Sequence, residues 1–145
     1  MNISGTLNLN GTGGNEVYLT RNDSTDSWQG LDFNKGATGS INYTYIEYVT
    51  YSDGYAINAD STAISLDNST LQYNNYGFYG NEQQTTLTNT VFQNNNYGYY
   101  VQNTANPNTN FGTGNVFSDN SICGIYYQDC ANLLTIENLT LQNNT

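Results

Sequence analysis

Large apolar residues alternate with mostly polar ones in short segments that recur along the chain. Leu71, Phe92, Phe117 and Leu141 occupy equivalent places in four of these segments. A period of two puts every second side chain on one face of an extended strand. The pattern therefore predicts β-strands in which these four residues form one inward core stack. No segment shows the apolar spacing of an amphipathic helix.

The alternation belongs to a longer repeat. Residues 68–80, 89–101 and 115–127 carry three copies, and a fourth begins at Asn138. The copies align on Gly77, Gly98 and Gly124, with a looser copy at Gly54, at spacings of 23, 21 and 26 residues. A period in the low twenties with β-forming residues is typical of a solenoid, in which each coil buries its apolar face by stacking on its neighbours.

Asparagines mark the bends inside the repeat, at 74–75, 94–96 and 143–144. Asparagine tolerates the left-handed backbone conformation, and stacked copies can form hydrogen-bonded ladders. The strand after the bend also alternates. One face of this strand should carry the residues at Tyr55, Ile57, Phe78, Gly80, Tyr99, Val101, Ile125 and Tyr127. The other face should carry those at Ala56, Tyr79, Tyr100 and Tyr126.

The repeat Asn-Ser-Thr-Leu-Gln-x-Asn-Asn-x-Gly-aromatic resembles that of right-handed parallel β-helix proteins, the pectate-lyase-like superfamily. Residues 4–20, 27–33 and 39–49 resemble the opening coils of β-helix modules in large secreted and cell-surface proteins of bacteria and archaea. The resemblance implies an all-β, right-handed parallel β-helix that covers residues 1–145 as a single domain. At roughly 24 residues a coil, the chain would form about six coils. The superfamily includes lyases, hydrolases, tailspikes and adhesins, so the resemblance does not decide activity.

Charge excludes two classes of partner. The chain has a formal net charge of −10, and its only basic residues are Arg21 and Lys35. Nucleic acids and anionic membrane surfaces both need cationic partners, and no apolar run is long enough to insert into a membrane. Only 10% of the residues are charged, while Asn, Thr, Ser and Tyr are abundant. This balance favours an extracellular or cell-surface protein.

The start of the chain leads directly into a strand pattern without a secretion signal, which indicates a mature segment or a module of a longer polypeptide. N-glycosylation is an open interpretation, because a chain so rich in Asn and Thr also produces acceptor motifs by chance. The candidate acceptors are Asn2, Asn10, Asn22, Asn42, Asn68, Asn138 and Asn143.

The two cysteines, Cys123 and Cys130, flank one predicted strand. An extended chain of that length spans up to about 23 Å, far more than a disulfide allows. We expect two buried or half-buried thiols. A disulfide remains the alternative if the chain bends between them, since the inferred location is oxidising.

Less regular segments lie between the repeats. Trp28 should pack near a corner, with Leu31 and Phe33 inward, and a one-residue slip predicts a bulge or corner near residues 45–46. Residues 102–113 contain the only proline and are expected to form an external loop.

No cofactor or metal is predicted. Residues 21–27 read as a solvated polar loop, although Asn22, Ser24 and Asp26 have the alternating oxygen ligands of a calcium loop. The glycine and the terminal glutamate that such a loop needs do not follow.

Catalysis finds little support. The superfamily's lyases generally combine calcium-binding acids with an Arg or Lys base, and its hydrolases pair aspartates. This chain has no histidine, and its acids stand at differing positions of the repeats. Only Asp60 or Asp67 could meet a carboxylate of a neighbouring coil. We therefore predict a protein that is not an enzyme, with a polysaccharide lyase or glycoside hydrolase as the alternative.

Tyr79, Tyr100 and Tyr126 recur one coil apart on the outward face of one strand. Rows of aromatic rings can bind the apolar faces of sugars, so these residues are the candidate ligand-binding site. Packing between coils is the other interpretation, and we favour it slightly.

Neither end of the repeat array shows a cap, so the ends should pair with another copy or with the remainder of a longer chain. The sequence thus predicts a structural or adhesive module that can assemble end to end into filaments. A carbohydrate-binding or carbohydrate-processing β-helix is the alternative.

Overall fold

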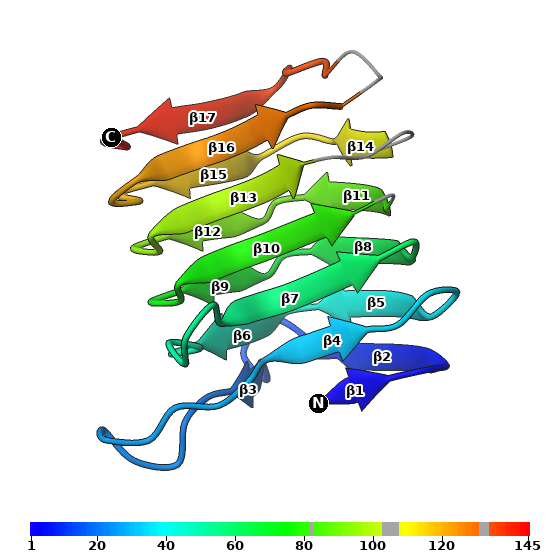
Figure 1. Cartoon of the computed structure of the whole chain (residues 1–145), viewed down its shortest axis with the longest axis vertical. Helices are drawn as coiled ribbons and strands as arrows, with labels where there is room; N and C mark the ends of the chain where they lie inside the picture. Colours follow the sequence, from blue (N-terminus) through cyan, green and yellow to red (C-terminus); the bar gives the residue numbers. More distant parts are fainter. Residues whose placement is uncertain (82, 103–107, 131–133) are drawn as a thin grey trace.

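The computed structural model describes residues 1–81, 83–102, 108–130 and 134–145, and these residues form strands and no helix. The strands stack as a parallel β-solenoid of about five turns (Figure 1), close to the six coils expected. The predicted all-β, parallel β-helix class is confirmed. No helix in the described part of the chain is long and apolar enough to span a membrane.

Each of the first five coils contributes one strand to each of three sheets, and the last described coil contributes β16 and β17 to the first and third sheets. In chain order, the first sheet contains β1 (Asn2–Ile3), β4 (Leu31–Phe33), β7 (Tyr55–Asp60), β10 (Tyr76–Asn81), β13 (Tyr97–Gln102) and β16 (Cys123–Gln128). The second contains β2 (Thr6–Asn10), β5 (Thr38–Asn42), β8 (Ala63–Asp67), β11 (Gln84–Thr88) and β14 (Asn108–Phe111). The third contains β3 (Val17–Leu19), β6 (Thr44–Glu47), β9 (Thr70–Gln72), β12 (Val91–Gln93), β15 (Asn115–Ser118) and β17 (Leu139–Gln142).

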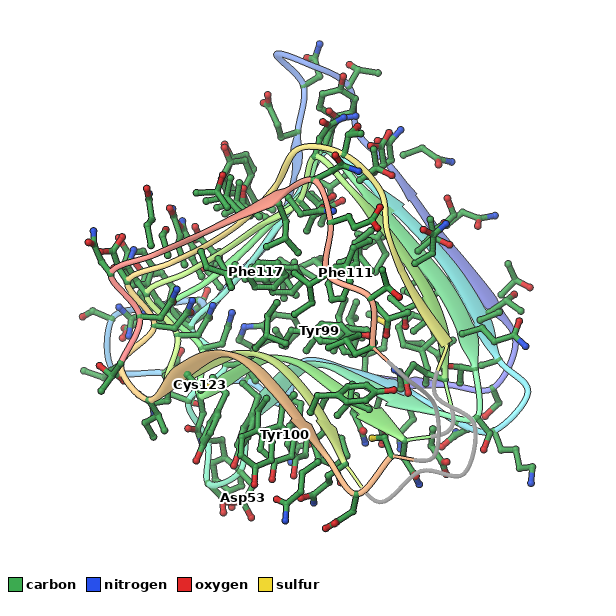
Figure 2. All side chains as sticks on the ribbon, turned by 90° about the horizontal axis from the view of Figure 1, so that it is seen from above. Asp53, Tyr99, Tyr100, Phe111, Phe117 and Cys123 are labelled. Atoms are coloured by element: carbon green, nitrogen blue, oxygen red, sulfur yellow. The ribbon has the colours of Figure 1, made fainter. Side chains whose placement is uncertain are left out.

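The core is a narrow column enclosed by the three sheets, which form a triangle when viewed along the axis (Figure 2). Leu71, Phe92 and Phe117 pair in register on β9, β12 and β15 and are fully buried. Leu141 follows in the same register but is 52% exposed, which differs from the expected buried place. It lies on β17, the outermost strand of its sheet among the described residues, and so has a described neighbouring strand on one side only.

Left-handed backbone conformations turn the chain between the third and first sheets. The residues concerned stack one above another at φ between 52° and 58°: Tyr48, Tyr73, Asn94, Asp119 and Asn143. Asparagine and aspartate tolerate this conformation, whereas a bulky residue pays a steric cost. Tyr48 and Tyr73 offset that cost in part by stacking their rings at 5.2 Å.

The alignment on Gly54 is wrong. Tyr55 pairs with Tyr76 in the parallel register, so Ala56 takes the place of Gly77 and is buried rather than outward. The corner before β7 holds five residues, 50–54, where the next coil has only Asn75. A corner can lengthen without disturbing the paired strands, which is why glycine spacing misplaced this coil.

Two further expectations change. The corner predicted at residues 45–46 lies at Tyr43, which has a φ of 45° and separates β5 from β6. Within the loop expected at 102–113, residues 108–111 form β14, because they pair with β11. Residues 103–107 of that expected loop lie outside the described residues.

Trp28 is half-buried at a corner, where its indole Nε1 donates to the Glu47 carbonyl at 2.7 Å.

Candidate functional site

Six tyrosines cover the outer side of the first sheet in two adjacent rows, which together we call the tyrosine face. One row is Tyr79, Tyr100 and Tyr126, which the sequence singled out, and the other is Tyr55, Tyr76 and Tyr97. Each ring is half-buried. In Figure 2 Tyr100 projects outward from the sheet, whereas Tyr99, its neighbour in sequence, lies inside the column.

Within each row the rings lie face to face, except that the Tyr55 ring is tilted by 52° to that of Tyr76. Tyr100 stacks on Tyr126 with ring centroids 4.5 Å apart and planes within 6°, and on Tyr79 at 5.6 Å. In the other row Tyr76 stacks on Tyr97 at 4.7 Å and 5°. Stacked and edge-to-face aromatic pairs each add about 0.5–1.5 kcal/mol beyond their burial. The tyrosine face therefore stabilises the contact between successive coils.

Between the rows most rings meet edge to face, whereas Tyr55 and Tyr79 are tilted by 34° with centroids 4.6 Å apart. The Tyr100 ring is nearly perpendicular to those of Tyr76 and Tyr97, at centroid distances of 5.4 and 5.2 Å. Ring faces within a row are thus covered by neighbouring rings, and the groups turned outward are ring edges and hydroxyls. A sugar stacks on a ring face, so this arrangement suits packing between coils better than glycan binding.

Three phenols of the tyrosine face, those of Tyr55, Tyr76 and Tyr100, have raised pKa values. Burial, followed by the charge that neighbouring phenols would carry, raises the pKa of Tyr100 to about 12. Burial is also the main cause of the raised pKa values of Tyr55 and Tyr76. A phenolate formed inside the cluster would be poorly solvated and would lie beside further rings of the same kind.

Alkaline pH should consequently destabilise the fold. Because the folded pKa of Tyr100 exceeds the unfolded value of 10.0, the folded protein holds its proton where the unfolded chain has lost it. The stabilisation is complete below pH 10 and is lost as pH rises toward 12. Absorbance titration of phenolate should show a late-ionising class, and Tyr100→Phe should reduce its amplitude. If every tyrosine titrates together near the ordinary pKa, the cluster does not exist in solution.

Amide side chains continue the tyrosine face along the strands. The Tyr100 hydroxyl donates to Gln102 Oε1 at 2.6 Å, and Gln102 Nε2 donates to the Tyr79 hydroxyl at 3.4 Å. The Tyr126 hydroxyl donates to Gln128 in the same way. These bonds hold the phenols in fixed orientations.

A ladder of asparagines runs inside the corner between the third and first sheets. Its members are Asn74, Asn95, Asn120 and Asn144, and the first three are almost fully buried. Each Oδ1 accepts a hydrogen bond from the backbone N–H of the residue at the equivalent position in the preceding coil. Asn95 Oδ1, for example, accepts from the Asn74 N–H at 3.0 Å. Each Nδ2 donates to a carbonyl of the preceding coil, on Ile46, Leu71, Phe92 and Phe117 respectively. The ladder therefore supplies partners to the buried backbone N–H groups of Val49, Asn74, Asn95 and Asn120, which the turn would otherwise leave unpaired.

The sequence pattern predicted an asparagine ladder and one tyrosine row, but it did not identify Asn120 of the ladder or the second tyrosine row. Asn120 was not assigned to the bends, although Asp119–Asn120 follows its strand at the same distance as Asn94–Asn95. The row of Tyr55, Tyr76 and Tyr97 was also overlooked. Its signal was the tyrosine before the aligned glycine in two copies.

Several carboxylates of the described residues contact amides of neighbouring coils. Asp60 pairs in register with Asn81 and accepts a hydrogen bond from its side chain at 3.3 Å. Asp67 lies between Asn42 and Thr88 in the neighbouring coils. Among the residues that the structure describes, neither aspartate thus gains the second carboxylate that paired acid catalysis needs. Amides of neighbouring coils also donate to Asp32, Glu47 and Asp119.

In residues 1–81, 83–102, 108–130 and 134–145, no group of three or more Cys, Asp or Glu side chains is placed to hold a metal ion. The calcium-like segment forms a local turn instead. The Asp23 carboxylate accepts hydrogen bonds from the backbone and hydroxyl of Thr25, which lower its pKa.

Cys123 and Cys130 are half-buried free thiols. Their Sγ atoms donate to the carbonyls of Ile125 and Gln128, two residues away in each case. Cys123 stands above Tyr97 at the end of its tyrosine row.

The structure separates the candidate glycosylation sites into two groups. Asn42 and Asn68 are half-buried, and Asn68 donates its amide to Asp67. The remaining acceptors are exposed: Asn2, Asn10, Asn22, Asn138 and Asn143.

Comparison of this chain with protein-family models, with curated proteins and with solved structures finds no match.

Proposed function

We propose that this chain is a non-catalytic structural or adhesive module of an extracellular or cell-surface protein, which extends end to end with further β-helix coils. The repeat pattern supports placing it in the pectate-lyase-like superfamily. The stacked tyrosines, phenylalanines and asparagines serve the same purpose in this proposal, since each strengthens contact between coils rather than forming a reactive centre.

The observation that supports the proposal most strongly is that the strands run in the same direction at the two ends of the column. At one end of the column the outermost strands of the three sheets are β1, β2 and β3, and at the other end they are β16, β14 and β17. All the strand pairs within the three sheets are parallel. A second copy placed head to tail would therefore continue all three sheets at once. Unpaired strand edges favour such addition.

The end that carries β16 and β17 is also apolar. Ile125, Tyr127, Leu134, Ile136 and Leu141 line a groove of about 480 Å³ there. Ile136 and Leu141 are 47% and 52% exposed. At the opposite end Leu7, Leu9 and Leu19 are half-buried. Apolar surface at both ends supplies the driving force for stacking, and a head-to-tail contact along a straight axis gives a filament rather than a ring.

Leu141→Asp tests the proposal because it puts a charge into this groove. Its effect on the fold should be small, since the side chain is half exposed. We expect the protein to form filaments in negative-stain microscopy, more readily at high salt because the chain carries a net charge of −10. The variant should need a concentration about tenfold or more higher, because burying an unpaired charge is costly.

Ile122→Asp is the matched control. Ile122 is 48% exposed but lies outside the groove, so this variant should assemble like the original protein. Light scattering that finds only monomer at high concentration and high salt would contradict end-to-end assembly. Equal assembly of all three proteins would show that the groove is not the contact.

A further inference from the structure

The long corner of residues 50–54 creates a depression beside the tyrosine face. It measures about 240 Å³ and is lined by Gln29, Tyr51, Ser52, Asp53, Gly54 and Tyr55. Tyr55 is the first ring of its row, so the depression lies where that row ends. The next two coils have a single residue, Asn75 or Asn96, at the same corner. The depression is therefore specific to this coil.

The lining combines aromatic rings with one carboxylate. Tyr51 is 62% exposed, and Asp53 is exposed beside it. In Figure 2 Asp53 lies outside the sheets, on the side to which Tyr100 projects. The negative charge of Asp53 contributes to the raised pKa values of Tyr55 and Tyr76, after burial and neighbouring phenols. Its field therefore reaches the end of the tyrosine row, where a cation would be stabilised.

The protein already contains such a contact in another row. The Arg21 guanidinium carbon lies 3.9 Å from the centroid of the Tyr48 ring, and Tyr48 stacks on Tyr73 in the coil above. A cation over an aromatic face within about 6 Å gains roughly 0.5–1 kcal/mol at an exposed site. At the Tyr48 row the chain supplies this cation itself.

We propose that the depression formed by Tyr51, Asp53 and Tyr55 binds an organic cation, a guanidinium or substituted ammonium group. The phenol rings provide the cation–π contact, and the Asp53 carboxylate provides the opposite charge. Gln29 and Ser52 add hydrogen-bonding groups to the rim. A divalent metal is a poor fit, because Asp53 is the only carboxylate in the lining. The net charge of −10 raises the local concentration of any cation.

The test uses N-acetylarginine N-methylamide, whose only charge is the guanidinium, in an NMR titration of the 145-residue protein. The backbone amides of residues 51–55 should shift saturably, with millimolar affinity. N-acetylcitrulline N-methylamide has nearly the same shape without the charge and should produce no saturable shift. Equal shifts with both probes, or shifts that map elsewhere, would overturn the proposal.

Two variants identify the groups that bind. Asp53→Asn and Tyr51→Leu should each weaken binding about two- to fivefold, as expected for an exposed ion pair and a cation–π contact. Both side chains are exposed, so the fold should survive. Asp26→Asn removes the same charge outside the lining and should leave the affinity unchanged. If Asp26→Asn weakens binding as much as Asp53→Asn, the attraction is non-specific and the site does not exist.

A second titration, with a peptide, distinguishes whether the cation belongs to a partner protein or to a small molecule. A pentapeptide with a central arginine between glycines should bind more tightly than the single amino-acid derivative if the natural ligand is a side chain of a partner protein. Equal affinities indicate a small free cation. Either result supports the site, whereas failure of the peptide and of the derivative to bind overturns it.

Discussion

Phe92→Ala should lower the free energy of unfolding by about 3–5 kcal/mol, as large-to-small changes in a buried core do. The Phe92 ring is fully buried and stacks on Phe117 with centroids 4.9 Å apart and planes within 2°. Its edge also meets Tyr99 at 6.1 Å. Removing it leaves a cavity that the coils above and below cannot close without giving up their strand pairing. Urea denaturation followed by circular dichroism measures the change.

Val91→Ala serves as the comparison for Phe92. Val91 precedes Phe92 on β12 and is half-buried on the opposite side of the strand. Its truncation should cost about 1 kcal/mol or less, since little buried volume is lost. If the two variants lose similar stability, Phe92 does not occupy the core and the register of the third sheet is different.

Asn95→Ala should destabilise the protein by about 1–3 kcal/mol, because it leaves the buried backbone N–H of Asn74 unpaired. Asn95 Oδ1 accepts the backbone N–H of Asn74, and its Nδ2 donates to the carbonyl of Leu71 at 3.0 Å. Both groups belong to the preceding coil, and the truncated side chain cannot replace either partner. Thermal or urea unfolding gives the difference.

The adjacent asparagine provides the control. Asn96 is exposed and donates its side chain to Asn75 Oδ1 at 2.7 Å. Water can replace that bond, so Asn96→Ala should cost less than about 1 kcal/mol. A small loss at Asn95, equal to that at Asn96, would contradict the ladder as a source of stability.

The strands were predictable because side-chain alternation is a direct property of the extended backbone. Leu31, Phe33, Phe92 and Phe117 could each be assigned to the inside from their neighbours in sequence alone, and each is fully buried. The corners were less predictable, since their length is not fixed by strand pairing. The extra residues at 50–54 shifted one coil by two positions relative to its glycine.

The site depended on details that the sequence does not encode locally. One tyrosine row could be recognised from its recurrence, but whether its rings present faces or edges depends on side-chain torsions that the neighbouring rings determine. The depression at Asp53 exists only because a long corner lies beside the first ring of the second row. Neither feature has a sequence motif.

The directional asparagine ladder has a mechanical consequence. Each of its bonds joins one coil to the next, as the strand pairs and stacked rings also do, so coupling between distant coils passes through every coil between them. In such a nearest-neighbour chain the terminal coils, which have one neighbour each, open at lower free energy than the middle ones. Tension along the axis should therefore peel coils off from the ends in succession. A column built this way yields gradually under load rather than breaking across its middle.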